Sequence, residues 1–270
     1  MIGIFDSGFG GSYIIDKIIN KLPEYDYVHL SDNARAPYGP HSKETILKYS
    51  KQAVDFLSKE GATLIIFACF TVSALALRSI QSDYIRKKNI KGKNILGILK
   101  PVVEKANELS KTNKIGVVGT KASIESNVFE IELKKLNKQN KVYQKSCPLL
   151  VPFIEEGWHN KPEAKMVLKK YLRPLKSYNV DSLILGCTHY PYMIKDFIRI
   201  MGKNTQILDP GVIEADSLKD YLERHPEIES KLTKKGKRQF YVTESPDKIL
   251  DFYKNFTKLK IKKVKKIELS

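Results

Sequence analysis

The stretch Leu64-Ile65-Ile66-Phe67-Ala68-Cys69 ends an apolar run with a cysteine, and Leu183-Ile184-Leu185-Gly186-Cys187 repeats that arrangement in the second half of the chain. Upstream, the strand-like segment Ile2-Gly3-Ile4-Phe5 recurs as Ile115-Gly116-Val117-Val118. The repeat predicts a duplicated scaffold that brings two thiols to one cleft from opposite sides. Two such groups, one on each face of a carbon atom, suit the inversion of a stereocentre.

The length and composition are those of a soluble globular protein. The chain has 270 residues, enough for two α/β lobes, of which 42% are hydrophobic and 29% charged. No apolar run is long enough to span a bilayer, and residues 1–6 lack the basic region of a secretory signal. We therefore expect a cytoplasmic protein with no membrane partner. The three cysteines show no paired spacing, which argues against a disulfide framework.

The formal net charge of +17 raises the question of a nucleic-acid partner. The basic residues are mostly lysines spread along the chain, whereas arginine is preferred for bidentate contacts with phosphates and bases. We therefore expect a solvated lysine surface without specific nucleic-acid binding. Of the two densest basic clusters, 231–238 and 258–266, the second alternates with apolar residues and predicts an exposed edge strand.

Strand-like and helix-like segments alternate throughout, which predicts an α/β fold with mainly parallel sheets flanked by helices. The predicted strands are 2–5, 27–30, 63–68, 114–118, 141–145 and 181–185, and the predicted helices are 12–22, 42–60, 72–81, 124–138 and 162–176. We expect loops at 31–41 and 146–152, and a further helix that begins at Pro101. Residues 1–96 plus 208–270 should form the first lobe, and 97–207 the second.

Polar residues gather at the predicted strand ends, where open α/β sheets bind their ligands. The residues at these positions are Asp6, Ser7, Cys69, Thr120, Cys187 and Asp209. The fold therefore predicts that the candidate chemical groups converge between the lobes.

Six ordered blocks of this sequence resemble those of bacterial glutamate racemase. They are Ile4–Gly11, Ser31–Gly39, Ala68–Cys69, Pro148–Pro152 with Glu155–Gly157, Leu185–Pro191 and Asp209–Gly211. The resemblance implies two pseudo-symmetric α/β lobes with the active site between them. It also implies an enzyme without cofactor or metal that interconverts L- and D-glutamate for peptidoglycan synthesis, and a homodimer.

The resemblance also implies roles for individual residues. Cys69 and Cys187 would exchange the parts of thiolate base and thiol acid, helped by Asp6, Glu155 and His189. A free thiol has a pKa near ~8.5, so a small downward shift makes a competent base near neutral pH. The residues expected to bind the substrate are Ser7, Pro37, Tyr38, Gly39, Phe70, Thr71, Thr120, Ser123 and Thr188. Cys187 and His189 could also suggest zinc, but no second Cys/His pair follows, so no metal is expected.

One residue departs from the family pattern. The family follows its first cysteine with Asn and Thr, whereas this chain has Cys69-Phe70-Thr71. A phenylalanine cannot hydrogen-bond to the substrate, and its ring should favour the neutral form of the Cys69 thiol. The loss of one such contact costs roughly tenfold to a hundredfold in rate.

Phe70 leaves several functions open. In the first, the chain is a glutamate racemase in which another group replaces the lost hydrogen bond to the substrate. In the second, the substrate is another acidic amino acid such as aspartate. In the third, the chain is a weakly active or regulatory relative of the family. A cysteine hydrolase is a further alternative, but it needs one thiol and does not explain the duplication. The complete block Leu185–Pro191 favours glutamate over aspartate.

Overall fold

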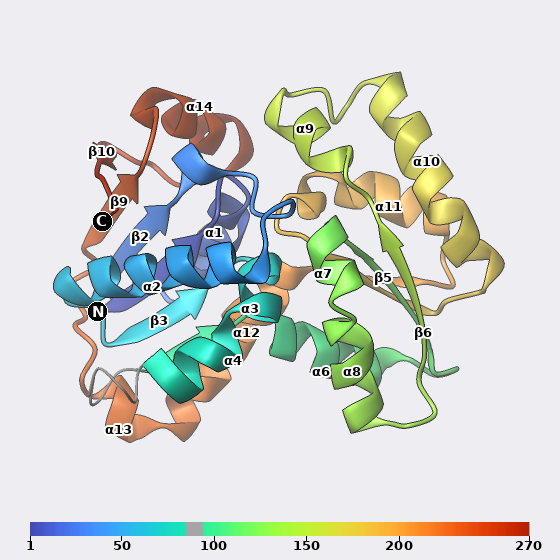
Figure 1. The fold of residues 1–270 in the computed structure, drawn as a ribbon, viewed down its shortest axis with the longest axis horizontal. Coiled ribbons are helices and arrows are strands. Elements are labelled where there is room, and N and C mark those ends of the chain that lie inside the picture. Colours follow the sequence, from blue (N-terminus) through green and yellow to red (C-terminus); the bar gives the residue numbers. More distant parts are fainter. Residues whose placement is uncertain (85–93, 270) are drawn as a thin grey trace.

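The computed structural model describes residues 1–84 and 94–269, which form two α/β lobes side by side (Figure 1). Each lobe is built on one sheet, and all strand pairs in the described residues are parallel. The first sheet has the order β10-β9-β2-β1-β3-β4 and the second β6-β5-β7-β8. The predicted fold class is confirmed.

The first sheet contains β1 (Ile2–Asp6), β2 (Tyr27–Ser31), β3 (Leu64–Phe67), β4 (Asn94–Gly97), β9 (Arg238–Val242) and β10 (Lys265–Lys266). The second contains β5 (Lys114–Gly119), β6 (Lys141–Ser146), β7 (Ser182–Gly186) and β8 (Gln206–Leu208).

The helices that flank these sheets come from the segments between the strands. In the first half they are α1 (Gly11–Lys21), η1 (Asn33–Arg35), α2 (Lys43–Lys59), α3 (Phe70–Leu75), α4 (Leu77–Ser79), the π-helical turn η2 (Ile80–Tyr84), α6 (Leu99–Leu109), α7 (Lys121–Glu125) and α8 (Val128–Leu136). In the second half they are α9 (Leu150–Glu155), α10 (Pro162–Ser177), η3 (Tyr190–Met193), α11 (Ile194–Met201), α12 (Pro210–Arg224), α13 (Pro226–Glu229) and α14 (Pro246–Phe256).

The two sheets repeat one strand order, which agrees with the duplicated scaffold that the sequence pattern predicted. β1 lies between β2 and β3, and β5 lies in the same way between β6 and β7. The glycines of the repeat serve close packing, because a Cβ atom on Gly3 would lie 2.8 Å from the Ala62 Cβ and one on Gly116 would lie 2.9 Å from the Leu183 Cδ1. The duplication thus places the ends of β3 and β7 at equivalent positions.

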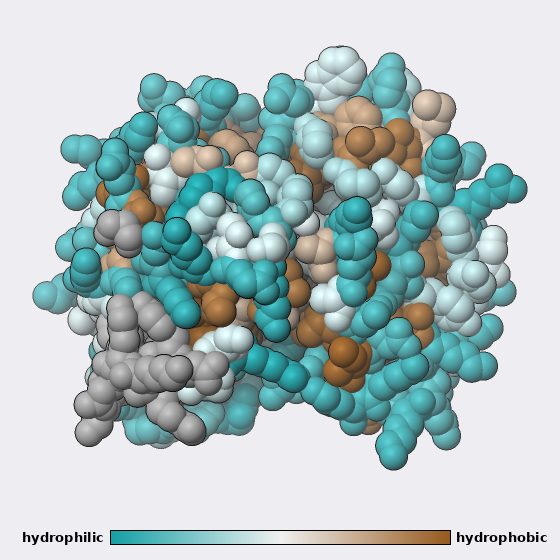
Figure 2. All heavy atoms as spheres, viewed as in Figure 1, coloured by the Kyte–Doolittle hydropathy of each residue, from teal (hydrophilic) through white to brown (hydrophobic). Residues whose placement is uncertain are grey.

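The lobes share part of their apolar core. One buried cluster joins Ile4 and Ile66 of the first sheet to Ile115 and Ile184 of the second, with α12 contributing Leu218. Hydrophilic side chains cover most of the face in Figure 2, in keeping with the positive net charge. Within the described residues, no helix has both the length and the apolar character to cross a bilayer.

Several predicted element boundaries were wrong. The predicted helix 124–138 is two helices, because Asn127 adopts a left-handed conformation with φ 53° between α7 and α8. The predicted loop at 146–152 runs into α9, and α6 begins at Leu99 rather than at Pro101. The predicted edge strand over 258–266 is reduced to the two residues of β10.

The points at which the chain passes from one sheet to the other indicate where the lobes divide. β4 is the last strand of the first sheet before β5, and β8 is the last strand of the second sheet before the chain returns to β9. We propose that the lobes divide close to residues 96 and 207, as the sequence suggested.

Candidate active site

A cavity of about 40 Å³ lies between the lobes at the carboxyl ends of β1, β3, β5 and β7. Every predicted site residue lines it except Asp6 and Ser123, and the strand-end residue Asp209 does not line it either, because its carboxylate caps α12 and accepts a hydrogen bond from the Tyr13 hydroxyl. The predicted residues around the cavity are Ser7, Pro37, Tyr38, Gly39, Cys69, Phe70, Thr71, Thr120, Glu155, Cys187, Thr188 and His189. The structure therefore gathers residues from six separate segments of the sequence at one place.

Cys69 follows β3 and is the N-cap residue of α3. Its Sγ lies 3.1 Å from the Ser7 Oγ, and the side chain is buried. Burial and the charge of Asp6 raise the pKa of the Cys69 thiol to about 12, although the hydrogen bond with Ser7 opposes this shift. In this arrangement Cys69 is a neutral thiol at physiological pH.

Cys187 directly follows β7 and has different partners. Its Sγ lies 3.7 Å from Nδ1 of His189, whose Nε2 lies 2.9 Å from Oε1 of Glu155. Burial lowers the pKa of His189, but the hydrogen bonds and negative charges of Cys187 and Glu155 outweigh it and raise that pKa to about 10. The ring is thus an imidazolium that attracts a negative charge on the Cys187 sulfur.

Asp6 lies beneath the cavity at the end of β1. Its Oδ2 accepts hydrogen bonds from the backbone amides of Gly8 at 3.1 Å and Gly11 at 2.8 Å. Burial raises the pKa of its carboxyl group, while the Gly11 amide and the charge of His189 oppose the shift. Asp6 therefore shapes the glycine-rich turn and acts on Cys69 through its charge.

Tyr38 is held in the cavity wall by Asp32. The Tyr38 hydroxyl donates a hydrogen bond to Oδ2 of Asp32, which also pairs with Arg35 at 2.6 Å. The other oxygen of Asp32 accepts a hydrogen bond from the Thr243 hydroxyl at 2.9 Å. Asp32 does not line the cavity, so its part is to position Tyr38.

Three hydroxyl groups join the lobes beside the cavity. The Thr71 Oγ1 of the first lobe lies 3.1 Å from the Thr120 Oγ1 and 3.3 Å from the Ser123 Oγ, both of the second lobe. The Thr120 hydroxyl donates to the Ser123 Oγ at 2.9 Å. Ser123 thus supports Thr71 and Thr120 from behind instead of lining the cavity.

The glycine-rich turn after β1 packs closely on the residues after β7. A Cβ atom on Gly10 would lie 2.3 Å from the Thr188 Oγ1 and 2.6 Å from Nδ1 of His189. Only a residue without a side chain allows this approach of the first lobe to the second.

The Phe70 ring points into the apolar contact between the lobes as well as lining the cavity. It is 1% exposed, and its centroid lies 5.8 Å from that of Phe129 on α8. Phe129 in turn covers Gly186, since a Cβ there would lie 2.8 Å from the Phe129 Cζ. The ring therefore connects the helix that follows Cys69 to the strand that precedes Cys187.

Sequence reasoning missed some of the site. Gly8, Ala36 and Val151 also line the cavity, and all three lie in or between segments already singled out, but small or apolar residues carry no chemical signal of their own. Thr243 gave no signal at all, because it reaches Asp32 across 211 residues. In the part of the chain that the structure describes, no group of three or more His, Cys, Asp or Glu side chains is placed to hold a metal ion.

Comparison with known proteins gives the family. The family model for Asp/Glu/hydantoin racemases matches residues 12–218, which include both cysteines. This chain belongs to that family. A glutamate racemase of Sulfurihydrogenibium sp. is 38% identical over 270 residues, covering 100% of this chain and 97% of that protein.

Solved structures of glutamate racemases agree with the fold. That of one isoform from Bacillus anthracis has a TM-score of 0.90 and 28% identity, and covers 100% of this chain and 97% of that one. That from Francisella tularensis, in complex with D-glutamate, has a TM-score of 0.88 and 32% identity, and covers 99% of this chain and 97% of that one. The chain is thus a racemase of the isomerase class.

Proposed function

We propose that this protein is a glutamate racemase that interconverts L- and D-glutamate by proton transfer between two cysteines. The observation that carries the proposal is that Cys69 and Cys187, from equivalent strand ends of two similar lobes, line one cavity. The similarity to glutamate racemases, one of them with bound D-glutamate, supports this substrate.

The proposed reaction needs one thiolate and one thiol. The thiolate takes the α-proton of glutamate from one face, which leaves the electron pair on the α-carbon. The thiol across the cavity then gives its proton to the other face, so that the configuration is inverted and the two sulfurs have exchanged protonation states. The proton balance closes without a metal or cofactor.

The surroundings of the two cysteines favour one resting state. Cys69 is held as a thiol by burial and by Asp6, whereas the Cys187 sulfur faces the His189 ring, which is paired with Glu155. We propose that Cys187 is the base in this state and Cys69 the acid, and that the roles are reversed after each turnover.

The substrate-binding residues of the proposal are small hydrogen-bonding groups. In this proposal Ser7, Thr71 and Thr188 hold the amino and carboxylate groups. The backbone of Tyr38 and Gly39 holds the side-chain carboxylate, since the Tyr38 hydroxyl already donates to Asp32. A cavity of about 40 Å³ holds only a few water-sized molecules, so the lobes must part before glutamate enters.

The direct test measures circular dichroism of the purified protein with L-glutamate, D-glutamate and each enantiomer of aspartate in buffer containing EDTA. We expect racemisation of glutamate from both sides and little turnover of aspartate. Faster turnover of aspartate would identify another acidic amino acid as the substrate, and no turnover of either would favour the regulatory role. We further propose that the protein is a cytoplasmic homodimer that supplies D-glutamate for peptidoglycan synthesis.

Changing Phe70 to Asn should raise kcat/KM for glutamate by about tenfold while lowering the free energy of unfolding by about 3 kcal/mol. The amide restores a hydrogen-bonding group beside Cys69, and the lost ring leaves Phe129 without its partner. Steady-state kinetics and urea unfolding measure the two effects separately. Phe70→Leu is the control, with unchanged kcat/KM and a smaller loss of stability. A lower kcat/KM for Phe70→Asn would mean that the site is adapted to the ring.

Changing Glu155 to Gln should move the high-pH limb of the kcat/KM profile to lower pH by about one unit. The reason is that the substitution removes a negative charge that raises the pKa of His189. The folded-state pKa of about 10 lies above the ordinary 6.5, so the ion pair stabilises the protein fully below pH 6.5 and loses this effect as the pH rises through 10. The pH–rate profile and urea unfolding at both extremes test this. The exposed neighbour Glu156→Gln is the control, and an unchanged high-pH limb for Glu155→Gln would remove His189 from the mechanism.

A further inference from the structure

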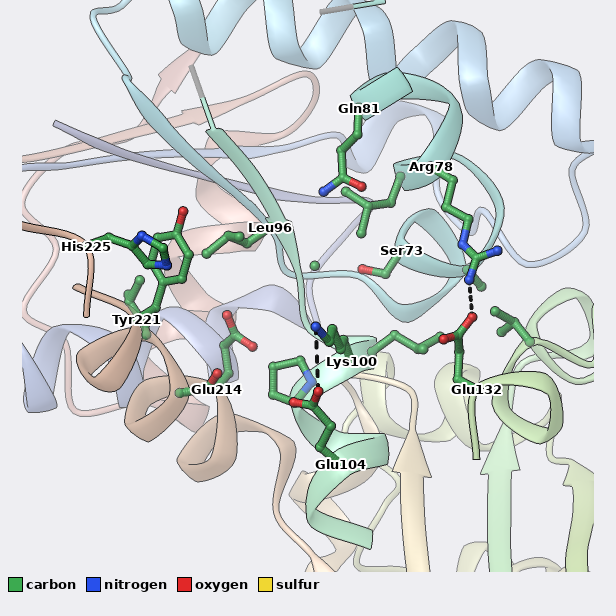
Figure 3. Close-up of a pocket in the computed structure, with 18 of the residues that line it drawn as sticks. Ser73, Arg78, Gln81, Leu96, Lys100, Glu104, Glu132, Glu214, Tyr221 and His225 are labelled. Atoms are coloured by element: carbon green, nitrogen blue, oxygen red, sulfur yellow. Dashed lines mark hydrogen bonds and ion pairs between the residues drawn. The ribbon is translucent and has the colours of Figure 1, made fainter. Parts of the chain in front are cut away.

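A second, larger cavity lies at the junction of the two lobes, away from the cysteines. It has a volume of about 400 Å³ and is enclosed by α3, α4 and β4 of the first lobe, α6 and α8 of the second, and α12 (Figure 3). This volume is in the range of small-molecule sites in proteins. None of its lining residues lines the cavity of the proposed active site.

Glu214 on α12 is the unusual residue of this cavity. Its side chain is 2% exposed, and Figure 3 shows its carboxyl group directed into the cavity. Among the described residues it has neither a hydrogen bond nor an ion pair, and its Oε2 is fully buried without a partner. A buried carboxyl group without a partner costs free energy, which a ligand that donates a hydrogen bond would recover.

The other charged side chains around the cavity already have counter-charges. Figure 3 shows the ion pairs of Arg78 with Glu132 and of Lys100 with Glu104, the latter at 3.6 Å. Arg224 is paired with Asp220 at 2.8 Å. Among the described residues that line the cavity, Glu214 is therefore the charged group that lacks a counter-charge.

The rest of the lining is suited to an apolar body. Leu77, Leu96 and Leu218 contribute aliphatic surface, and Tyr221 packs against His225 with ring centroids 4.4 Å apart. An aromatic ring beside a carboxyl group favours the binding of a cation, because the face of the ring attracts positive charge.

We propose that this cavity binds a small organic cation, namely a primary amine on a compact apolar body whose ammonium group donates a hydrogen bond to Glu214. The ligand would contact elements of both lobes at once. This site is independent of the proposed racemase reaction, because Glu214 belongs to neither the catalytic nor the substrate-binding residues.

The protonation of Glu214 gives the site a pH dependence. Burial raises the pKa of its carboxyl group to about 8, so in the absence of a ligand the group is largely neutral at pH 6.5 and largely ionised at pH 8.5. The titratable and charged groups facing it are Arg78 of α4, Lys100 and Glu104 of α6, Glu132 of α8, and Tyr221, Arg224 and His225 of α12 and its end. On α1, which also packs on α12, Lys21 is paired with Asp216 at 2.6 Å and Lys17 with Asp16 at 3.9 Å.

The experiment titrates the full chain with benzylamine, benzyl alcohol and benzoate by isothermal calorimetry. We expect saturable binding of benzylamine at pH 8.5 with a Kd of about 1 mM or below, and binding roughly twentyfold weaker at pH 6.5. Benzyl alcohol should bind weakly at both pH values, and benzoate least. Stronger binding of benzoate, or no pH dependence for the amine, would overturn the proposal.

Two variants locate the site. Glu214→Gln keeps the shape of the side chain and should weaken benzylamine binding at pH 8.5 at least tenfold, whereas the rim variant Glu104→Gln should change it less than threefold. Unchanged binding by Glu214→Gln would refute the assignment, as would displacement of benzylamine by D-glutamate, which would place the amine in the other cavity. If Glu214→Gln does not fold, the pH series and the three matched probes on the unaltered chain decide the question.

Discussion

Replacing either Cys69 or Cys187 with alanine should lower kcat for racemisation about a thousandfold or more in both directions. Each turnover uses one sulfur as base and the other as acid, and both line the same cavity. The measurement is the rate of change of optical rotation from L- and from D-glutamate. Retention of a tenth of the activity by either variant would exclude the two-cysteine mechanism.

Exchange of the substrate α-hydrogen with solvent deuterium shows whether a cysteine variant has lost racemisation because a catalytic group is missing or because the protein is unfolded. In D₂O each alanine variant keeps one cysteine, which can still remove and return the α-hydrogen on its own face. We expect each variant to exchange the α-hydrogen of one enantiomer only, and the two variants to act on opposite enantiomers. Cys147→Ala is the matched control, because Cys147 is buried outside the cavity, and it should racemise glutamate at nearly the rate of the unaltered protein.

Replacing Gly10 with alanine should lower kcat/KM about a hundredfold, which is the expected cost of misplacing a catalytic group by about 1 Å. The added methyl group would lie 2.6 Å from Nδ1 of His189, the atom that faces the Cys187 sulfur. Either the His189 ring turns away or the lobes cannot close, and both separate the two sulfurs from their working positions.

Asn20→Ala provides the control for this prediction. Asn20 is an exposed residue of α1, the helix that directly follows Gly10, and it does not line the cavity. We expect less than a threefold change in kcat/KM for Asn20→Ala, and native far-UV circular dichroism for both variants. Equal activity of the two variants would show that the lobes do not need the close contact at Gly10.

The sequence predicted the fold class and the meeting of most site residues for one physical reason. A buried parallel strand is a short apolar run, and its last residue lies at the edge where ligands bind, so Cys69, Cys187 and Thr120 could be placed from pattern alone. The alternation of strands and helices predicted the parallel sheets, and the chain length with the duplicated pattern predicted two lobes.

Other features depend on contacts that no local pattern records. The break at Asn127 needs a left-handed residue that a helical period does not reveal. The link from Tyr38 through Asp32 to Thr243 joins segments far apart in the chain. The sequence also pointed to Phe70 as a departure, but only the structure provides its partner, Phe129.

The unlike partners of the two sulfurs have a thermodynamic consequence. In an achiral solvent the enantiomers of glutamate have equal free energy, so their equilibrium constant is one. The Haldane relation then requires equal kcat/KM for L- and D-glutamate, however different the environments of Cys69 and Cys187 are. The asymmetry can therefore change kcat and KM between the two enantiomers only by the same factor. One thiol is held neutral and the other lies beside an imidazolium. We therefore expect the protein to bind one enantiomer of glutamate more tightly and to release it more slowly.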